Sequence, residues 1–176
     1  MHPTDDPIRE VHLVELTQTA PSDLLTQARE LLLEYGRFVI SQPAAAQFCL
    51  GALEKEAARL PLSFQEQGGG ALVGLVNGKP AGFVAWRRPP GQFTEDSWEL
   101  KRLWVRPEGR GTGLGRALTQ AVLDRAAASG RKAVYLDTVP GAMTSALRLY
   151  LEMGFERCAP YGDNPIEQLE YLVKRL

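Results

Sequence analysis

The residues best suited to chemistry in this sequence lie in one glycine-rich turn. Residues 106–116, RPEGRGTGLGR, contain the glycines and arginines on which the prediction depends: Gly111, Gly113, Gly115, Arg106, Arg110 and Arg116. The first amides of a helix have no intrahelical acceptor, and the helix dipole places about half a positive charge there. Glycines leave such amides uncovered, and arginine guanidinium groups suit phosphate oxygens. The turn therefore predicts a site for a phosphate or pyrophosphate.

Two familiar phosphate-binding motifs do not match this turn. Both registers of the dinucleotide motif G-x-G-x-x-G fail, because Arg116 and Leu118 stand where the last glycine is required. The phosphate loop of NTPases needs Gly-Lys followed by Ser or Thr, and the Gly-Lys pair of this chain is followed by Pro80. The pattern that is present is Arg-x-x-Gly-x-Gly, at Arg110, Gly113 and Gly115. On the glycines alone, a turn without a ligand is the alternative.

The turn is expected to join a strand to an amphipathic helix. Residues 98–105, WELKRLWV, have the length and the β-branched and aromatic composition of a strand, and Pro107 follows them. Apolar residues then recur at spacings of three and four, at Leu114, Ala117, Leu118, Ala121 and Val122. Gly130 stands where a left-handed C-terminal cap is expected.

Two segments together resemble a known family. The run ELKRLWVRPEGRGTGLGRAL, followed downstream by SALRLYLEMGF, resembles the GNAT superfamily of acyl-CoA-dependent N-acetyltransferases. Arg110, Gly113 and Gly115 stand on the fixed positions of its acyl-CoA-binding motif, and Tyr150 precedes the Gly-Phe pair as the family's tyrosine does. The strong match covers residues 98–158, and the order of predicted elements extends it over nearly the whole chain. Two motifs in the right order and spacing are more specific than either alone.

The resemblance implies a three-layer GNAT-like α/β fold in a single domain of residues 1–176. A mixed central sheet of about seven strands is expected, with an antiparallel N-terminal meander, a parallel pair at a splayed centre, a C-terminal hairpin and helices on both faces. The sequence predicts these elements in order. Strand 11–16 is followed by a helix from Ser22 to about 35, with Ser22 or Asp23 as its cap and Gly36 as its end, and then by a helix over about 44–59.

The second half of the chain continues the same order of elements. Asn77 and Gly78 predict a hairpin between strands 71–76 and 81–86. After the central strand and its helix come a buried strand over 133–138, a helix that ends at Gly154, and a hairpin of strands 155–158 and 169–173. In the central strand, Leu100 and Leu103 would face opposite sides of a regular pleat. An extra residue at Lys101-Arg102 would turn both toward the core, and the resembled family has such a bulge, which parts two parallel strands.

Acetyl-CoA is the co-substrate that the resemblance implies. The amides of the turn would hold its phosphates, and strand amides near Leu103, Trp104 and Val105 would bind the pantetheine. The expected turn contacts are Arg110, Gly111, Thr112, Gly113, Leu114, Gly115 and Arg116. Many family members have an asparagine seven residues before the tyrosine, where this chain has Met143, so Thr144 or Ser145 is a candidate replacement for that cofactor contact.

Two residues are the candidates for proton transfer. Glu99 is the candidate general base, directly or through a water, because the family often carries a glutamate at the matching position; the alternative is an exposed carboxylate at a strand entrance. Tyr150 matches the tyrosine that protonates the leaving thiolate, and the alternative is a core tyrosine. Glu95 and Asp96 are poorer candidates because they lie in the preceding loop. Tyr161 and Asn164 either reach the acceptor or only shape their turn.

Composition restricts the remaining classes of function. With 176 residues, 44% of them hydrophobic, the chain has material for one core. A net charge of −1 disfavours a nucleic-acid partner, no apolar run is long enough for a membrane span, and the opening MHPTDDPIRE is unlike a signal peptide. Two cysteines make neither a disulfide framework nor a metal site, and His2 and His12 have no partner at ligand spacing. A cytoplasmic protein is the simplest interpretation.

These observations favour an enzyme that transfers acetyl from acetyl-CoA to a primary amine by direct attack in a ternary complex. The near-neutral charge favours a small-molecule amine or an amino acid as acceptor. Three alternatives stay open: a non-catalytic acyl-CoA-binding or sensing domain, a protein N-acetyltransferase, and an unrelated nucleotide-binding module, which the failed motifs disfavour. Homodimers are common among proteins of this resemblance.

Overall fold

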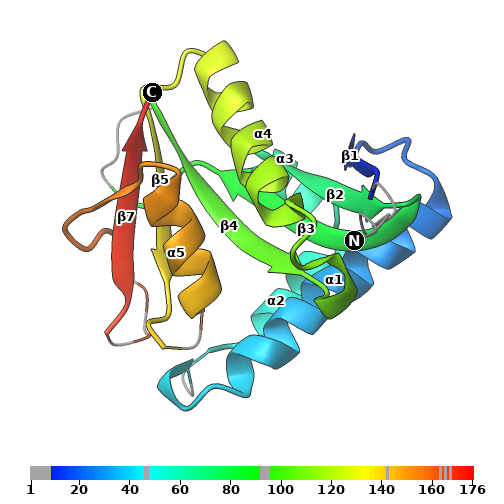
Figure 1. The fold of residues 1–176 in the computed structure, drawn as a ribbon, viewed down its shortest axis with the longest axis horizontal. Helices are drawn as coiled ribbons and strands as arrows, with labels where there is room; N and C mark the ends of the chain where they lie inside the picture. The colour runs from blue at the N-terminus through cyan, green and yellow to red at the C-terminus, as the bar shows by residue number, and fades with distance from the viewer. Residues whose placement is uncertain are drawn as a thin grey trace, which may run out of the picture.

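A single seven-stranded mixed sheet with helices on both faces forms the body of the chain (Figure 1). The computed structural model describes residues 9–45, 48–91, 96–141, 143–162, 164, 166 and 168–176. The strands are β1 (Val11–Glu15), β2 (Gly70–Val76), β3 (Lys79–Arg87), β4 (Ser97–Val105), β5 (Ala133–Thr138), β6 (Glu156–Arg157) and β7 (Glu170–Arg175), in the spatial order β1-β2-β3-β4-β5-β7-β6. Only the β4–β5 pair is parallel, so the predicted meander, parallel centre and closing hairpin are confirmed.

The helices form the two outer layers. On one face lie α1 (Ser22–Ile40), α2 (Leu50–Ala58) and α3 (Leu62–Gln65), and on the other lie α4 (Leu114–Ala128) and α5 (Thr144–Glu152). Successive strand residues serve opposite layers: Leu72 and Val84 pack in the core with α4, while Val73 and Phe83 pack in the core with α1. This alternation is the period of two that a sheet covered on both faces requires.

The first two predicted helices differ from those observed. Helix α1 continues to Ile40, because Gly36 does not end it but is buried where α1 packs against Leu53 of α2. It begins at Ser22, with Pro21 at the cap position, so Ser22 is not the cap, and Asp23 instead complements the dipole from the first turn. The predicted helix over 44–59 is a 3₁₀ turn, Pro43–Ala45, followed by α2. A second 3₁₀ turn, Pro107–Gly109, follows β4.

The bulge predicted in the central strand is confirmed. Between the pairs Phe83–Trp104 and Ala85–Lys101, β4 contains one residue more than β3. Arg102 absorbs this residue with a left-handed φ of 62°. As a result Leu100 and Leu103 both contact the core beneath α4 and α5.

Strands β4 and β5 pair only at their beginnings. Their parallel pairing ends at Glu99 and Tyr135, after which the two strands diverge (Figure 1). The edge of β4 beyond Glu99 therefore has no strand partner on the β5 side within the described residues. Among the helices of those residues, none has both the length and the apolar composition needed to cross a bilayer.

The N-terminus of α4 lies very close to the sheet. Leu114, the first residue of the helix, is 1% exposed and packs directly on Gly74 of β2 and Gly82 of β3. A Cβ at Gly82 would lie 2.9 Å from Leu114, and one at Gly74 would overlap the same side chain. These two glycines therefore set the height of the helix N-terminus above the sheet.

Replacing Gly74 by valine should lower the free energy of unfolding by about 1–3 kcal/mol, because the new side chain overpacks the core at Leu114. Urea denaturation monitored by circular dichroism measures the change. Gly51→Val is the matched control, since Gly51 is an exposed helical position with open space around it. Equal stability of the two variants would contradict this account of how α4 is seated.

Candidate active site

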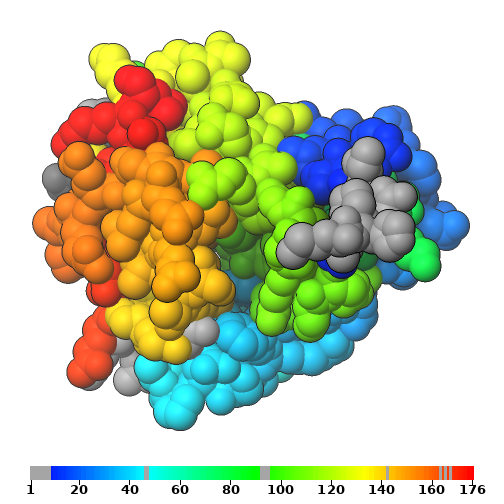
Figure 2. Space-filling view, in the orientation of Figure 1, coloured from blue at the N-terminus to red at the C-terminus, as the bar shows by residue number. Residues whose placement is uncertain are grey.

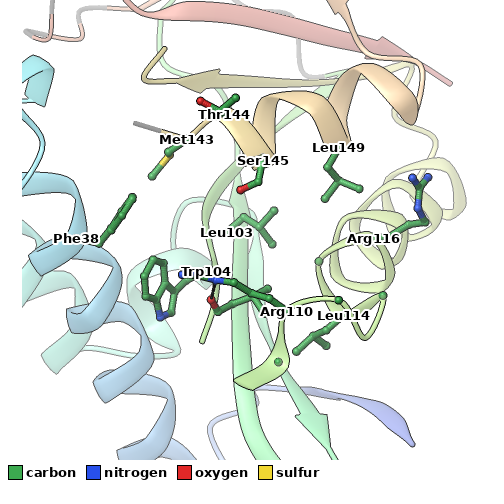
Figure 3. Close-up of a pocket in the computed structure, with 16 residues that line it drawn as sticks. Phe38, Leu103, Trp104, Arg110, Leu114, Arg116, Met143, Thr144, Ser145 and Leu149 are labelled. Atoms are coloured by element: carbon green, nitrogen blue, oxygen red, sulfur yellow. Dashed lines mark hydrogen bonds between the residues drawn. The ribbon is translucent and has the colours of Figure 1, made fainter. Parts of the chain in front are cut away.

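A cavity of about 640 Å³ lies where β4 and β5 diverge. Its walls are β4, the glycine-rich turn with the start of α4, and the start of α5, and Figure 2 shows this face hollowed between α5 and the segment that joins β4 to α4. Most of the residues predicted to bind a cofactor line it: Leu103, Trp104, Val105, Arg110, Gly111, Gly113, Leu114, Gly115 and Arg116 (Figure 3). The structure thus brings the predicted strand and turn residues together in one concave site.

The turn has the backbone conformation that its glycines permit. Gly111 and Gly113 have φ values of 73° and 84°, in the left-handed region. Gly113 is the residue before α4, so the first amides of the helix point into the turn. Thr112 is the predicted contact that does not line the cavity. Its hydroxyl donates to the Gly109 carbonyl at 2.6 Å and accepts from the Leu114 amide at 3.3 Å, so it shapes the turn.

The three arginines of the motif have different positions. Arg110 lies along the cavity with its guanidinium 5.5 Å from the Trp104 ring centroid, and its Nε donates to the Val105 carbonyl at 3.2 Å (Figure 3). Arg116 lines the rim and pairs with Glu152 at 2.9 Å. Both residues contribute to the lining of the cavity, but the guanidinium of Arg116 is paired with Glu152.

Arg106 was expected beside the turn, and this expectation is wrong. Its guanidinium instead binds both carboxylate oxygens of Glu34 on α1, at 2.8–3.0 Å. Trp104 donates its indole N–H to the same carboxylate at 3.0 Å. Burial by itself would raise the pKa of Glu34. The hydrogen bonds from Arg106 and Trp104 outweigh that effect and lower the pKa. Arg106 therefore fastens α1 to the end of β4 and does not face the cavity.

The start of α5 supplies the opposite wall of this cavity. Met143, Thr144 and Ser145 all line it, and Ser145 directs its hydroxyl toward β4 (Figure 3). Thr144 donates to the Gly141 carbonyl at 3.5 Å. Of the two hydroxyls considered as replacements for the missing asparagine, that of Ser145 is the better placed.

A second cavity, of about 350 Å³, lies on the other side of Met143. Met143 lines both cavities, so they adjoin at the start of α5. The second cavity contains charged residues from β3, β4 and β5: Arg87, Glu99, Lys101, Arg102 and Asp137. The loop before β7 adds Tyr161 and Asn164.

Glu99 is at the centre of a hydrogen-bonded network in this second cavity. It is 1% exposed, so the alternative of an exposed carboxylate at a strand entrance is wrong. Arg87 donates to Glu99 at 2.9 Å, Lys101 lies 3.5 Å away, and the Tyr161 hydroxyl donates at 3.2 Å. Burial and the Glu99 carboxylate raise the pKa of Tyr161, which keeps that phenol a donor. A buried carboxylate in a cavity that adjoins the glycine-rich turn's cavity is a candidate acid–base group.

These features agree with a family comparison. A model of the acetyltransferase (GNAT) family matches residues 27–155, which include the β4 residues that line both cavities and the α5 residues that line the first. The chain belongs to the GNAT family. The match covers well over half of the chain and contains Glu99, the turn and Tyr150.

Individual GNAT relatives resemble the chain over part or all of its length. An uncharacterized N-acetyltransferase of Schizosaccharomyces pombe is 39% identical over 74 residues, 42% of this chain and 45% of that protein. The crystal structure of an acetyltransferase from Streptococcus agalactiae aligns with a TM-score of 0.73 at 19% identity, covering 94% of this chain and 98% of that one. PaiA N-acetyltransferase from Thermoplasma acidophilum, solved in complex with coenzyme A, aligns with a TM-score of 0.64 at 13% identity, covering 95% and 99%.

The two kinds of comparison support different statements. At such low identities the structural alignments show the GNAT fold alone. The aligned parts of the curated relatives cover between 20% and 55% of the lengths of those proteins. Family and fold are therefore established, whereas activity and substrate belong to the proposal below.

Tyr150, the tyrosine of the second GNAT motif, is buried beneath the cavity wall. It is 4% exposed, contacts Phe155 edge to face, and is not among the residues that line either cavity. Burial raises its pKa, and Tyr35 and Asp137 of the second cavity raise it further. Its helix neighbour Leu149 does line the first cavity. Tyr150 thus keeps its proton at neutral pH.

Sequence reasoning missed three charged members of this GNAT site. Arg87, Lys101 and Asp137 come from three strands, and nothing in their spacing links them. Lys101 and Asp137 lie two residues beyond the last β4–β5 pair, Glu99 with Tyr135. That common position is the signal that could have found them once the strands were aligned.

Glu95 lies outside the described residues, and Asp96 pairs with Lys132 at 2.9 Å. Among the described residues, no cluster of three His, Cys, Asp or Glu side chains could hold a metal.

Gly113→Val should weaken binding of CoA by at least about 10-fold, because the side chain would cover amides of the turn. Calorimetric titration measures the dissociation constant. Gly130→Val is the matched control: both glycines have left-handed φ and open space for a Cβ, so both variants carry the same backbone strain, but Gly130 is at the far end of α4. Equal CoA affinity in the two variants would contradict a phosphate site at the turn.

Proposed function

We propose that this chain transfers the acetyl group of acetyl-CoA to a small primary amine, by direct attack within a ternary complex. The observation that carries the proposal is the adjacency of the two cavities at Met143. One has a helix N-terminus and two arginines that suit a nucleotide's phosphates, and the other has a buried carboxylate that suits an amine. Direct transfer requires two such sites side by side, because both substrates must be bound at once.

The first cavity fits acetyl-CoA by the chemistry of its lining. The turn amides and Arg110 favour phosphate oxygens, and the edge of β4 beyond Glu99 offers backbone groups to the amides of a pantetheine chain. Apolar side chains of Leu103 and Leu149 cover the inner end. The structural relative from Thermoplasma acidophilum binds coenzyme A, which supports the same ligand here. Acetyl-CoA supplies the acyl carbon as an activated thioester.

Glu99 is the proposed general base. As the amine nitrogen forms its bond to the acyl carbon, one N–H proton must leave, and Glu99 accepts it directly or through a water. The carboxylate lies in the second cavity, where Arg87 and Lys101 hold it in position. The bond between the acyl carbon and sulfur breaks in the same sequence of events, and the sulfur then needs a proton.

Tyr150 is the proposed source of that proton. Its raised pKa keeps the phenol protonated at neutral pH, which a proton donor requires. Tyr150 is 4% exposed and follows Leu149, which lines the first cavity, so donation requires its hydroxyl to reach the sulfur at the wall of that cavity.

Release of CoA in the presence of amines tests the proposed function. The purified protein is incubated with acetyl-CoA and a panel of small primary amines; thiol release is followed optically, and the products are identified by mass spectrometry. Acetylated amine formed together with CoA supports the proposal. Tight binding of acetyl-CoA without any acetylated product would identify a sensing domain and overturn it.

Glu99→Gln should lower kcat by about 100-fold or more, because the amide cannot accept the amine's proton. The affinity for acetyl-CoA should stay within about twofold of the wild type, since Glu99 lies in the other cavity. Glu66→Gln is the control for the same chemical change at an exposed, ion-paired site. A Glu99→Gln variant that keeps the kcat of the wild type would remove this residue as the base.

Tyr150→Phe should lower kcat by about 100-fold while changing acetyl-CoA affinity little, because the ring still fills its place beside Phe155. Single-turnover kinetics separate the chemical step from product release. An unchanged kcat, with the chemical step shown to limit the rate, would mean that Tyr150 is only a core tyrosine and not the proton donor.

A further inference from the structure

The charges in the second cavity are balanced internally. Both carboxylates in its lining already face cations: Glu99 contacts Arg87 and Lys101, and Asp137 lies 3.6 Å from Lys101. The third cation, Arg102, pairs with Glu56 at 3.0 Å. The described lining therefore offers no carboxylate without a cation beside it.

This balance decides which kind of amine the cavity can hold. A ligand with only positive charge would add a buried cation to groups that are already neutralised, at a considerable cost in desolvation. A ligand that carries one positive and one negative group adds no net charge. Its positive group can pair with a carboxylate of the cavity while its negative group pairs with a cation of the cavity.

Lys101 is the cation best placed to take the negative group of such a ligand. Its ammonium is 3.5 Å from Glu99 and 3.6 Å from Asp137, longer than the 2.9 Å contact between Arg87 and Glu99. Arg102 is held by Glu56 and lies over the rings of Tyr35 and Phe48, at 5.7 and 5.6 Å. Lys101 is thus the cation held at the greater distances, and its side chain is 11% exposed, within the cavity.

Part of the cavity wall is apolar. Val39, Val139 and Ile166 form a small buried cluster there, with Leu169 and Met143 packed against it. A hydrocarbon side chain of the ligand would be removed from water by these residues. The cavity therefore combines a charged end with an apolar end.

We infer that the acceptor is an amino acid with an apolar side chain, that it binds as a zwitterion and loses one ammonium proton to water before the attack, and that Lys101 binds its carboxylate. This inference rests on the proposed function. A carboxylate that draws Lys101 toward itself also removes one of the two cations beside Glu99.

Matched pairs of acceptors test the inference with the wild-type protein. L-leucine is compared with isopentylamine, and L-phenylalanine with phenylethylamine, so that each pair differs only in the carboxylate; spermidine represents a polycation. The kcat/KM of each amino acid should exceed that of its matched amine by at least about 10-fold, the range expected for a charge-assisted hydrogen bond.

Lys101→Met supplies the second, independent readout. It should lower kcat/KM for the amino acids by about 10- to 100-fold and bring the ratio of amino acid to matched amine toward one. Lys101→Arg should retain most of that ratio, because it keeps the cation. Lys132→Met is the control, since Lys132 is 80% exposed and pairs with Asp96 outside the cavity; its ratio should equal that of the wild type.

Matched amines or spermidine that react as fast as the amino acids would overturn the inference while leaving the proposed function intact. So would a Lys101→Met variant that keeps the wild-type ratio. A protein that binds acetyl-CoA but acetylates none of these compounds would instead overturn the proposed function, and the inference with it.

Discussion

The parting of β4 from β5 after the Glu99–Tyr135 pair is the feature on which the site depends. Hydrogen bonding between parallel strands would otherwise continue, and side chains would fill the space between them. One extra residue in β4, absorbed at Arg102 in a left-handed conformation, turns the strand away while keeping Leu100 and Leu103 on the same core. The bulge leaves an edge of β4 without a partner on the β5 side, beside the N-terminus of α4.

The two cavities on either side of Met143 have different electrostatic character. The first is lined by the helix N-terminus and by Arg110 and Arg116, with no carboxylate among its described lining residues, an arrangement that favours an anion. The second contains a network in which Lys101 lies between Glu99 and Asp137. Removing one partner of a buried ion pair is expensive, so such a network holds its geometry until a ligand with matching charges exchanges with it. The junction between these sites is where an acyl donor and an amine can meet.

Local signals in the sequence predicted the fold and the first cavity well. Gly111 and Gly113 favour the left-handed backbone of the turn, and the odd spacing of Leu100 and Leu103 predicted the bulge. Both features depend on local residue type and spacing, so they can be predicted without knowing the tertiary contacts. The length of α1 and the position of Arg106 were predicted wrongly. Gly36 is helical because α2 packs against it, and Arg106 turns to Glu34, 72 residues away in the chain. The members of the second cavity come from separate strands, so only the strand register brings Arg87, Lys101 and Asp137 to one place.

A crystal structure of the protein with acetyl-CoA would show directly whether the two cavities form one active site. We expect the pyrophosphate on the amides at the start of α4, the pantetheine along the edge of β4 beyond Glu99, and the acetyl group at Met143, facing the cavity that contains Glu99. Acetyl-CoA bound elsewhere, or bound with its acetyl group directed away from Glu99, would contradict the claim that the two cavities form one active site.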